Sequence, residues 1–362
     1  MKPYLVVLII FQSFYGSSQT AVLVCSLSDS LAESSGLINL NGRLITHNDS
    51  GGEAILYEID TTSGMISRQV SLVNALNVDW ESLCYDNDYI YVGDFGNNLG
   101  DRTNLKIYRL SINDYINTIN DTVLVDTIRF NYEDQTSFIP MQYATNFDAE
   151  AFLPIGDSLY IFTKNWGNDW TNIYSVPKIP GTYQANRVDS IQIQGLITGA
   201  TLQTSTHSMA LLGHVLTPFF VDISSSDLPT FSDLTVITTN FNVPASFQVE
   251  GLTNAGTNSY YITAEDHLTG TASLYRFTPS YLGVNESFQN HKAKFYPNPC
   301  QGVLFFDSSI YASLELYDQK ERLIYKVSVS PLNVESLASG IYFAKLIDAN
   351  GDVISKDKLI IE

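Results

Sequence analysis

The chain has 362 residues, of which 44% are hydrophobic and 12% aromatic, so it can build one large core and a second, smaller one. This composition excludes a globally disordered chain. A formal net charge of −19 argues against nucleic-acid binding, which needs clustered Lys and Arg side chains. The acidity is typical of a soluble exported protein, and cation binding is the more specific alternative.

The first 18 residues have the pattern of a secretory signal peptide. Lys2 supplies the positive charge, residues 5–11 form the apolar core, and Gly16-Ser17-Ser18 precede the expected cleavage point. The apolar core is too short to span a bilayer, and no later stretch is long enough. We therefore expect an exported protein without a transmembrane segment.

The three cysteines, Cys25, Cys84 and Cys300, do not have the spacing of a metal site. Cys25 and Cys84 lie in expected strands, where a cysteine is typically a small buried hydrophobe. A disulfide between these two remains open for an exported chain.

From residue 22 to residue 279, short runs rich in Tyr, Ile, Val, Phe and Thr alternate with polar turns, which is the pattern of β-strands. One short helix is expected within residues 111–121. A longer unit also repeats: a glutamate, an apolar run, a tight turn, and a second strand that ends in a polar cluster. The glutamates are Glu33, Glu81, Glu150 and Glu250, with Gly199 and Ala200 at the corresponding place of a fourth, weaker copy.

The copies recur about every 50 residues, with one step of 69, and this is the length of a four-stranded propeller blade. We predict an all-β fold in which residues 19–280 form a β-propeller of five blades. A sixth blade is the open alternative. It would lie in the insertion that causes the long step, or be completed by residues 22–27, which would then close the ring.

In a propeller the innermost strand lines the channel and the next strand returns beside it, so both glutamates and polar clusters should lie at one mouth of the channel. Two roles stay open for them: ligand or ion binding, or bonds that lock neighbouring blades together through backbone N–H groups. The candidate residues are Glu33, Glu81, Glu150, Glu250, Asn48, Asp49, Asp94, Asn97, Lys164 and Glu265.

Carboxylates brought within a few ångströms repel one another, and raised pKa values, hydrogen bonds or a bound cation can relieve the repulsion. An all-oxygen set of ligands favours calcium, whereas zinc would prefer His or Cys. We therefore expect calcium as the ion at this mouth.

No catalytic nucleophile is indicated, because the chain has no G-x-S-x-G motif and its histidines lack metal spacing. His47, close to Asp49, is either a base at the mouth or, more typically, a turn residue bonded to a backbone carbonyl. Trp80 is expected between blades. Trp166 and Trp170, in a polar loop, are better candidates for stacking on a ligand.

The stretches ESSGL, THNDSGG, NVDWESL and VGDFGNNLGDRTNLKIYR resemble secreted bacterial propellers related to phytase-like and esterase-like propellers, over residues 31–277. In the calcium-dependent phytases, carboxylates at the channel hold metal ions that bind the phosphates of the substrate. The resemblance thus implies calcium at the acidic positions. Lys164 is the one cation expected among the carboxylates, and Arg102, Lys106 and Arg109 lie near the second blade. These cations do not form the basic cluster that a polyphosphate substrate would need.

After a linker at residues 281–294, residues 295–362 have their own strand pattern and are predicted to form a small β-sandwich. Their motifs resemble the C-terminal sorting domain of type IX secretion cargo. The resemblance implies passage through the periplasm and across the outer membrane by the secretion machinery, to the cell surface or beyond, with the domain usually removed. The residues that carry it are Tyr296, Pro297, Asn298, Pro299, Gly302, Gly340, Tyr342 and Lys358.

Two classes of function remain for the propeller. One is a module that binds a small molecule, a glycan or a surface protein, with a structural ion at the mouth; the lack of a nucleophile and of a basic pocket favours it. The other is a metal-dependent hydrolase of a phosphate ester, lactone or ester, which the ring of carboxylates favours.

Overall fold

The computed structural model describes residues 19–279, except 169, 194, 204–207, 216, 226–227, 229–230, 232–233, 244–247 and 267–270, and residues 295–361, except 307–311, 321 and 348–352. The expected signal peptide and linker lie outside these residues. The described chain is almost entirely β-strand, which confirms the all-β prediction.

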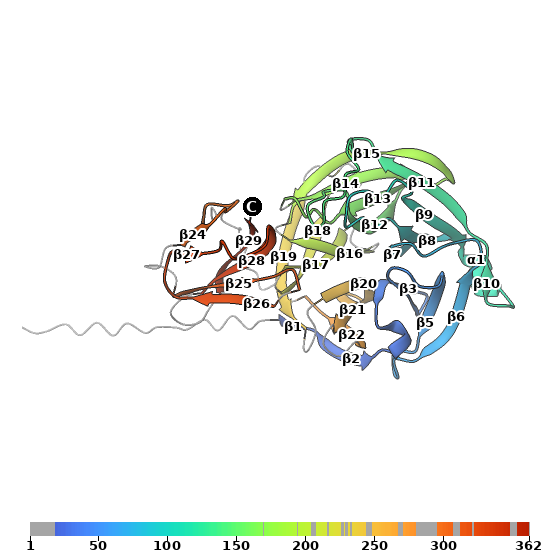
Figure 1. The fold of residues 1–362 in the computed structure, drawn as a ribbon. Helices are drawn as coiled ribbons and strands as arrows, with labels where there is room; N and C mark the ends of the chain where they lie inside the picture. Colours follow the sequence, from blue (N-terminus) through green and yellow to red (C-terminus); the bar gives the residue numbers. More distant parts are fainter. Residues whose placement is uncertain are drawn as a thin grey trace, which may run out of the picture.

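Five antiparallel meanders of strands follow one another along the chain and surround a common axis (Figure 1). The first is β3 (Ser34–Leu40), β4 (Arg43–Asn48), β5 (Ile55–Ile59) and β6 (Ile66–Leu72). The second is β7 (Trp80–Tyr85), β8 (Tyr89–Asp94), β9 (Lys106–Ser111) and β11 (Asp126–Tyr132). The third is β12 (Ala149–Ile155), β13 (Ser158–Thr163), β14 (Trp170–Pro177) and β15 (Gly181–Gln192). The fourth is β16 (Leu196–Gln203), β17 (Ser208–His214), β18 (Pro218–Ser224) and β19 (Thr235–Asn242). The fifth is β20 (Gln248–Gly256), β21 (Ser259–Asp266) and β22 (Thr271–Phe277), which β2 (Val22–Ser26) completes.

Short elements decorate the outer edges of the meanders. The strands β1 (Gln19–Thr20) and β10 (Thr122–Val123) add in parallel to β19 and β6, and β11 pairs in parallel with β15, so the second and third meanders share one eight-stranded sheet. The helix α1 (Ile112–Asn117) is the expected short helix, and the 3₁₀ helix η1 (Asp29–Leu31) precedes β3.

The first strand of each meander lies innermost, and each innermost strand contacts two others in the ring order β3, β7, β12, β16, β20 and back to β3. Such a strand is covered on both faces by its neighbours, which explains why runs such as SSGLI and WESLC are buried without alternation. Apolar clusters fill the space between adjacent meanders. This arrangement is a β-propeller.

The strand β2 closes the ring, because it comes from the start of the described chain and pairs with β22 of the last meander. Leu27 and Leu31, which follow it, are buried in a cluster that joins the last meander to the first. The segment VLVCSL (residues 22–27) therefore closes the ring, but it does so by completing the fifth meander and not by completing a sixth.

The C-terminal residues form two further sheets. One holds β23 (Phe295–Tyr296), β24 (Val303–Phe306) and β27 (Leu332–Asn333). The other has the order β26 (Leu323–Val327), β25 (Ser313–Tyr317), β28 (Gly340–Ile347) and β29 (Val353–Ile361). Both sheets share one apolar core, which includes Leu304, Leu314 and Leu346.

All three cysteines are free thiols; Cys84 and Cys300 are buried and Cys25 is half-buried. Within the described residues, no helix is long and apolar enough to cross a membrane.

Ring closure can be tested at Gly64, which lies in a turn against β2. A Cβ built on Gly64 would lie 1.8 Å from the carbonyl oxygen of Ser26, and its φ is +72°. Gly42 is a matched control, because its φ is +87° but nothing lies within 4 Å of an added Cβ. We expect Gly42→Ala to cost about 1 kcal/mol of unfolding free energy through backbone strain alone. Gly64→Ala should cost about 1–3 kcal/mol more through overpacking.

Urea denaturation of the two variants measures this difference. Equal losses would contradict the packing of β2 against this turn.

Candidate functional site

Two of the expected glutamates are extra residues in the pairing of the first two strands of their meanders. Trp80 pairs with Asp94 and Ser82 pairs with Gly93, so Glu81 has no partner on β8. Glu150 on β12 is left out in the same way, and a similar shift of register occurs at Glu250 on β20. Bulged residues of this kind are re-aimed relative to the regular alternation of a strand. The three carboxylates lie close enough to perturb one another.

In the first and fourth meanders, the residue equivalent to Glu81 is not the one expected from the sequence. By the same register, Ser35 rather than Glu33 and Thr198 rather than Gly199 correspond to Glu81. Glu33 precedes β3 and is exposed. The hydroxyls of Ser35 and Thr198 donate hydrogen bonds to backbone carbonyls of the next innermost strand, at Glu81 and at Val249. Bonds between innermost strands are therefore made by these hydroxyls.

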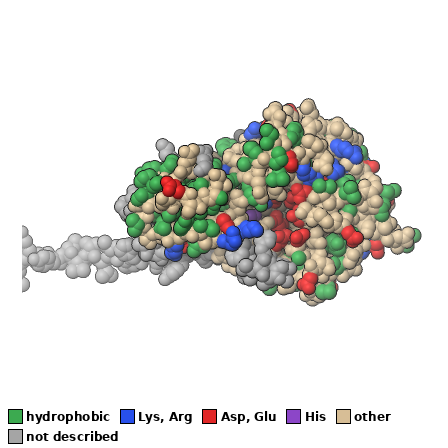
Figure 2. All heavy atoms as spheres, viewed as in Figure 1, with side chains coloured by type: hydrophobic (Ala, Val, Ile, Leu, Met, Phe, Trp, Pro, Cys, Tyr) green, Lys and Arg blue, Asp and Glu red, His purple; other side chains and the backbone are tan. Residues whose placement is uncertain are grey.

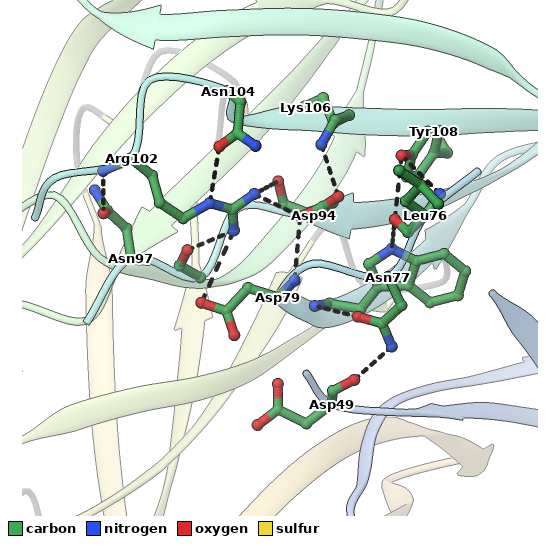
Figure 3. Close-up of polar contacts among 12 residues, drawn as sticks. Asp49, Leu76, Asn77, Asp79, Asp94, Asn97, Arg102, Asn104, Lys106 and Tyr108 are labelled. Carbon is green, nitrogen blue, oxygen red and sulfur yellow. Dashed lines mark hydrogen bonds and ion pairs between the residues drawn. The ribbon is translucent and has the colours of Figure 1, made fainter. Parts of the chain in front are cut away.

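One of the polar residues expected at the end of the second strand of each meander is also assigned to the wrong position. Asp49, Lys164 and Glu265 hold equivalent places, but Phe95 rather than Asp94 holds the place on the second meander. A shift of one residue turns a side chain to the opposite face of its strand. Asp94 is fully buried there, and its carboxylate accepts from Arg102 at 2.6 Å and Lys106 at 2.8 Å (Figure 3).

Asn97 has a structural role beside Asp94. Its backbone N–H donates to Asp148 Oδ1 at 2.7 Å and its side-chain amide donates to the Phe147 carbonyl at 3.0 Å. Its Oδ1 accepts from the backbone N–H of Arg102. These bonds use both ends of the amide, so Asn97 ties the loop after β8 to the third meander.

The tightest group of carboxylates at the mouth is Asp49, Asp79 and Glu81, each of which offers an oxygen within 4.8 Å of the other two. Glu81 is only 4% exposed. Within the described residues, no donor forms a hydrogen bond to the carboxylate of Asp49 or Glu81, whereas Asp79 has the Arg102 guanidinium at 3.8 Å. Figure 3 shows Asp49 and Asp79 reaching this place from different meanders.

Asp79 and Asp148 were missed by the sequence reasoning, although a signal was present. Both belong to Asp-x-Glu tripeptides, Asp79-Trp80-Glu81 and Asp148-Ala149-Glu150, which stand at the same place of two successive repeats. Asp148 is fully buried, and it accepts hydrogen bonds from the Asn97 backbone and from Trp166 Nε1.

A wider acidic ring surrounds the group, and Figure 2 shows its Asp and Glu side chains gathered at the centre of the propeller face. Glu150, Glu250 and Glu265 are all buried. Lys164, also buried, donates to Glu150 Oε1 at 2.6 Å. Lys164 is the expected cation of this mouth, and its charge offsets only part of the negative charge.

Burial and mutual repulsion raise the pKa values of four acids at this mouth: Asp49, Asp79, Glu81 and Glu265. Burial, then the charges of Asp79 and Glu250, raise the pKa of Asp49 to about 8. Burial and the charge of Glu250 raise the pKa of Glu265 to about 9. Burial and the charge of Asp148 raise the pKa of Asp79 to about 6. The pKa of Glu81 is raised well above its usual value by burial and by Glu150 and Asp49.

Asn48 is the last residue of β4 and directly precedes Asp49. Its amide nitrogen donates to the Ser30 carbonyl at 2.8 Å. Its Oδ1 is buried and accepts no hydrogen bond from the described residues, and the same holds for Asp49 Oδ1. The first meander thus has two buried oxygen atoms without described donors at the end of β4, and of these two residues Asp49 belongs to the acidic group.

His47 is not a base at this mouth. It is fully buried, packs edge-on against Trp80 with ring centroids 5.3 Å apart, and donates from Nδ1 to the Asn48 carbonyl at 2.9 Å. Burial lowers its pKa to about 4, so the ring is neutral near pH 7. Trp80 packs between meanders as expected.

The two loop tryptophans differ from each other. Trp166 is buried and donates to Asp148, so it is not available to stack on a ligand. Trp170 is 41% exposed and stays the better candidate of the two.

The cations near the second meander are engaged elsewhere. Arg102 and Lys106 neutralise Asp94, while Arg109 pairs with Asp126 at 2.6 Å and stacks on the Tyr89 ring. They do not form a free basic pocket.

Residues 294–362 match the family of secretion system C-terminal sorting domains. Asn298 ties the segment of Pro297 and Pro299 to β29, since its amide donates to the Lys358 carbonyl and its Oδ1 accepts from the Ile360 backbone N–H. The chain therefore carries a type IX sorting domain, which indicates export to the cell surface or secretion.

No curated protein matches this sequence. Solved structures with a similar fold include the GH43_1 enzyme from Xanthomonas citri, at 9% identity and a TM-score of 0.43 over 74% of this chain and 93% of that one. Another is the Cps50 (Swd1) β-propeller domain of Myceliophteria thermophila, at 10% identity and a TM-score of 0.39 over 72% and 100%. A third is the periplasmic gluconolactonase PpgL of Pseudomonas aeruginosa, at 13% identity and a TM-score of 0.32 over 90% and 85%. Likeness at this level carries no argument about activity.

The structural role of Asp94 can be tested through its partner Arg102. Replacing Arg102 by Met leaves a fully buried carboxylate with one cation instead of two, and breaking a buried pair typically costs about 3–5 kcal/mol. We expect a loss of about that size in denaturant unfolding, and a partial recovery when Asp94→Asn is added. The exposed pair of Arg187 and Asp134 is the control, and Arg187→Met should cost less than about 1 kcal/mol.

If Asp94→Asn instead deepened the loss, Asp94 would not be the group that Arg102 neutralises.

The sorting assignment predicts that residues 281–362 are sufficient for export. Fused to a reporter that normally stays in the periplasm of a host with the secretion machinery, they should bring the reporter to the cell surface or the medium. Deletion of residues 295–362 from the full chain should leave the propeller in the periplasm. Cell fractionation with immunoblotting measures both; a reporter that stays periplasmic would remove the assignment.

Proposed function

We propose that the exported protein is a five-bladed β-propeller, followed by a small β-sandwich, whose acidic channel mouth binds a divalent cation as part of a ligand-binding module. The five innermost strands and their ring order support the count of five blades. The shared core of the two C-terminal sheets supports the sandwich. The ligand would be a small molecule, a glycan or a surface protein outside the cell.

The observation that carries the proposal is the group formed by Asp49, Asp79 and Glu81. Two carboxylates 4.8 Å apart repel by about 3 kcal/mol at an effective dielectric of 20, and three such pairs meet here. The alternative in which glutamates lock blades would need hydrogen bonds from backbone N–H groups to Glu81 or Glu250. No described residue makes such a bond to either carboxylate, and hydroxyls bond the innermost strands instead.

The ligand atoms fit a hard cation. Carboxylate oxygens of Asp49, Asp79 and Glu81 are available, and the buried amide oxygen of Asn48, which has no described donor, is a further candidate ligand. Calcium takes six to eight oxygen ligands in flexible geometry, whereas zinc prefers nitrogen and sulfur. His47, the nearest histidine in sequence, is buried against Trp80, and so calcium suits this set better.

A metal-dependent hydrolase is the second candidate. Lys164 favours it, since a buried ammonium within an acidic mouth could stabilise negative charge that develops on an ester or lactone oxygen. A bound cation would supply Lewis acidity and an activated water. Arg102, Lys106 and Arg109 are all paired, which argues against a polyphosphate substrate of the phytase kind.

Cation binding should be visible as stabilisation. At a calcium concentration 100 times the dissociation constant, binding contributes about 2.7 kcal/mol, which would raise the melting temperature by roughly 5–10 °C. EDTA should remove this shift. Glu81→Gln should reduce it to a small fraction, while Asp157→Asn, an exposed turn residue at the opposite end of the third meander, should leave it unchanged.

Differential scanning calorimetry of the three proteins, each with calcium and with EDTA, measures the shift. If neither calcium nor EDTA changed the melting temperature of the wild type, the proposed ion site would be wrong.

The raised pKa values predict a pH dependence of stability. Because the folded pKa of Asp49 is about 8 and that of Glu265 about 9, the folded chain binds more protons than the unfolded chain near neutral pH. Unfolding free energy without metal should therefore fall as pH rises from 6.5 to 8.5, a window above the titration of His47. Saturating calcium should flatten the fall, since the ion stabilises the deprotonated carboxylates.

Denaturant unfolding at several pH values, with calcium and with EDTA, gives both slopes. Stability that rises with pH in EDTA would contradict the raised pKa values.

Binding and hydrolysis can be separated with one protein. The calcium-loaded chain is tested on phosphate esters, lactones and carboxylic esters, beside Lys164→Met. Turnover that is lost in both Glu81→Gln and Lys164→Met would establish the hydrolase; ion binding without turnover on any substrate supports the binding module.

A further inference from the structure

The sorting domain has a second apolar face in addition to its core. Along β28, Ala344 and Leu346 point into the core between the two sheets, and Ile341 and Phe343 alternate with them and belong to the opposite face. On an isolated domain these two side chains would be open to water. In the full chain Ile341 is only 7% exposed and Phe343 only 5% exposed.

The propeller covers this face. Ile341 and Phe343 pack in one cluster with Trp166 and Leu196, and Tyr143 and Val215 of the propeller lie at its edge. Figure 1 shows the C-terminal sheets beside the fourth meander. We call the propeller side of this contact, Tyr143, Trp166, Leu196 and Val215, the rim patch.

A polar bond fixes the orientation of the contact. Tyr317, Phe343 and Lys358 are direct neighbours across β25, β28 and β29 and therefore form one row on the outer face of the sheet. The Lys358 ammonium donates to the backbone carbonyl of Trp166 at 2.9 Å. An apolar row with a lysine at its end thus meets an apolar patch with a free carbonyl.

The rim patch lies at the acidic mouth. Trp166 follows the end of β13, two residues after Lys164, and Leu196 begins β16 opposite His214, so both stand at the end of the channel that holds the glutamates. Trp166 also contacts the acidic ring directly. Its Nε1 donates to Asp148 Oδ2 at 2.7 Å, and Lys164 Nζ lies 5.0 Å from the centre of its ring.

We propose that the docked sorting domain braces the rim of the mouth: it holds Trp166 and, through Trp166, fixes the positions of Asp148 and Lys164. The mouth of the full chain is then more rigid than the mouth of a propeller from which the sorting domain has detached. When the domain leaves, the rim patch becomes an exposed apolar surface beside the acidic ring. This proposal does not depend on a bound ion.

The test compares hydrogen exchange in the full-length wild type, Phe343→Asp and Val329→Asp, all without added metal. Phe343 lies in the interface and outside the domain's own core, whereas Val329 is an exposed residue of the same domain. The informative amides are Lys164 N and Trp166 N, which donate to Asp148 and Thr145 carbonyls, and Asn97 N, which donates to Asp148 Oδ1.

We expect exchange at all three amides to become at least tenfold faster in Phe343→Asp and to stay unchanged in Val329→Asp. Unchanged exchange at Lys164 and Trp166 in both variants would overturn the docking. Faster exchange there with unchanged exchange at Asn97 would overturn the coupling of docking to the mouth.

A second readout covers the case in which Phe343→Asp unfolds the sorting domain, which faster exchange in β25 and β29 would reveal. The milder Ile341→Ser is then compared in the same way. In a Trp170→Phe background only the buried Trp80 and Trp166 remain, so acrylamide should quench fluorescence several-fold more strongly in Ile341→Ser than in its parent. Equal quenching would contradict the proposal.

Discussion

Closure of the strand ring is the constraint on which the rest of this structure depends. The innermost strands of the described residues meet around one axis, and β2, from the start of the described chain, closes their ring by pairing with the last meander. Each innermost strand is then covered on both faces and must be apolar along its middle. Near its start, Glu81, Glu150 or Glu250 stands on three of these strands. The acidic mouth is thus a consequence of closure, since residues far apart in sequence converge only when the ring is complete.

The convergence of acidic side chains has an electrostatic cost, which differs between the mouth and the neighbouring buried site of Asp94. Around Asp94 the cost is offset, because Arg102 and Lys106 bring two positive charges to one buried carboxylate. Around Asp49 and Glu81 no described cation forms an ion pair with either carboxylate, and burial raises both pKa values. The ion pairs of Asp94 join neighbouring strands. The carboxylates of Asp49 and Glu81 would instead be stabilised by a bound cation. This contrast, rather than the acidity of the whole chain, is what supports a cation site.

Much of the architecture is readable from the sequence, because the repeat of glutamate, apolar run, turn and polar cluster has the length of a blade. The sorting domain is readable as well, since its motifs occur in order. The exact residue at each position of the repeat is harder to predict from the sequence. Glu33 and Ser35, or Asp94 and Phe95, differ by one or two places, and the bulges that decide between them depend on pairing with the neighbouring strand. The burial of Trp166 could not be foreseen, because it depends on a domain nearly 200 residues away packing on its loop.

The central claim is that the oxygens of Asp49, Asp79 and Glu81 share one cation, and anomalous diffraction tests it most directly. Crystals of the propeller grown with manganese, which accepts the same oxygen ligands as calcium and scatters anomalously, would be measured above the manganese absorption edge. The account predicts one strong anomalous peak in contact with carboxylate oxygens of these three residues, and its absence from crystals of Glu81→Gln. A map with no peak at this mouth, or an unchanged peak in the variant, would contradict it.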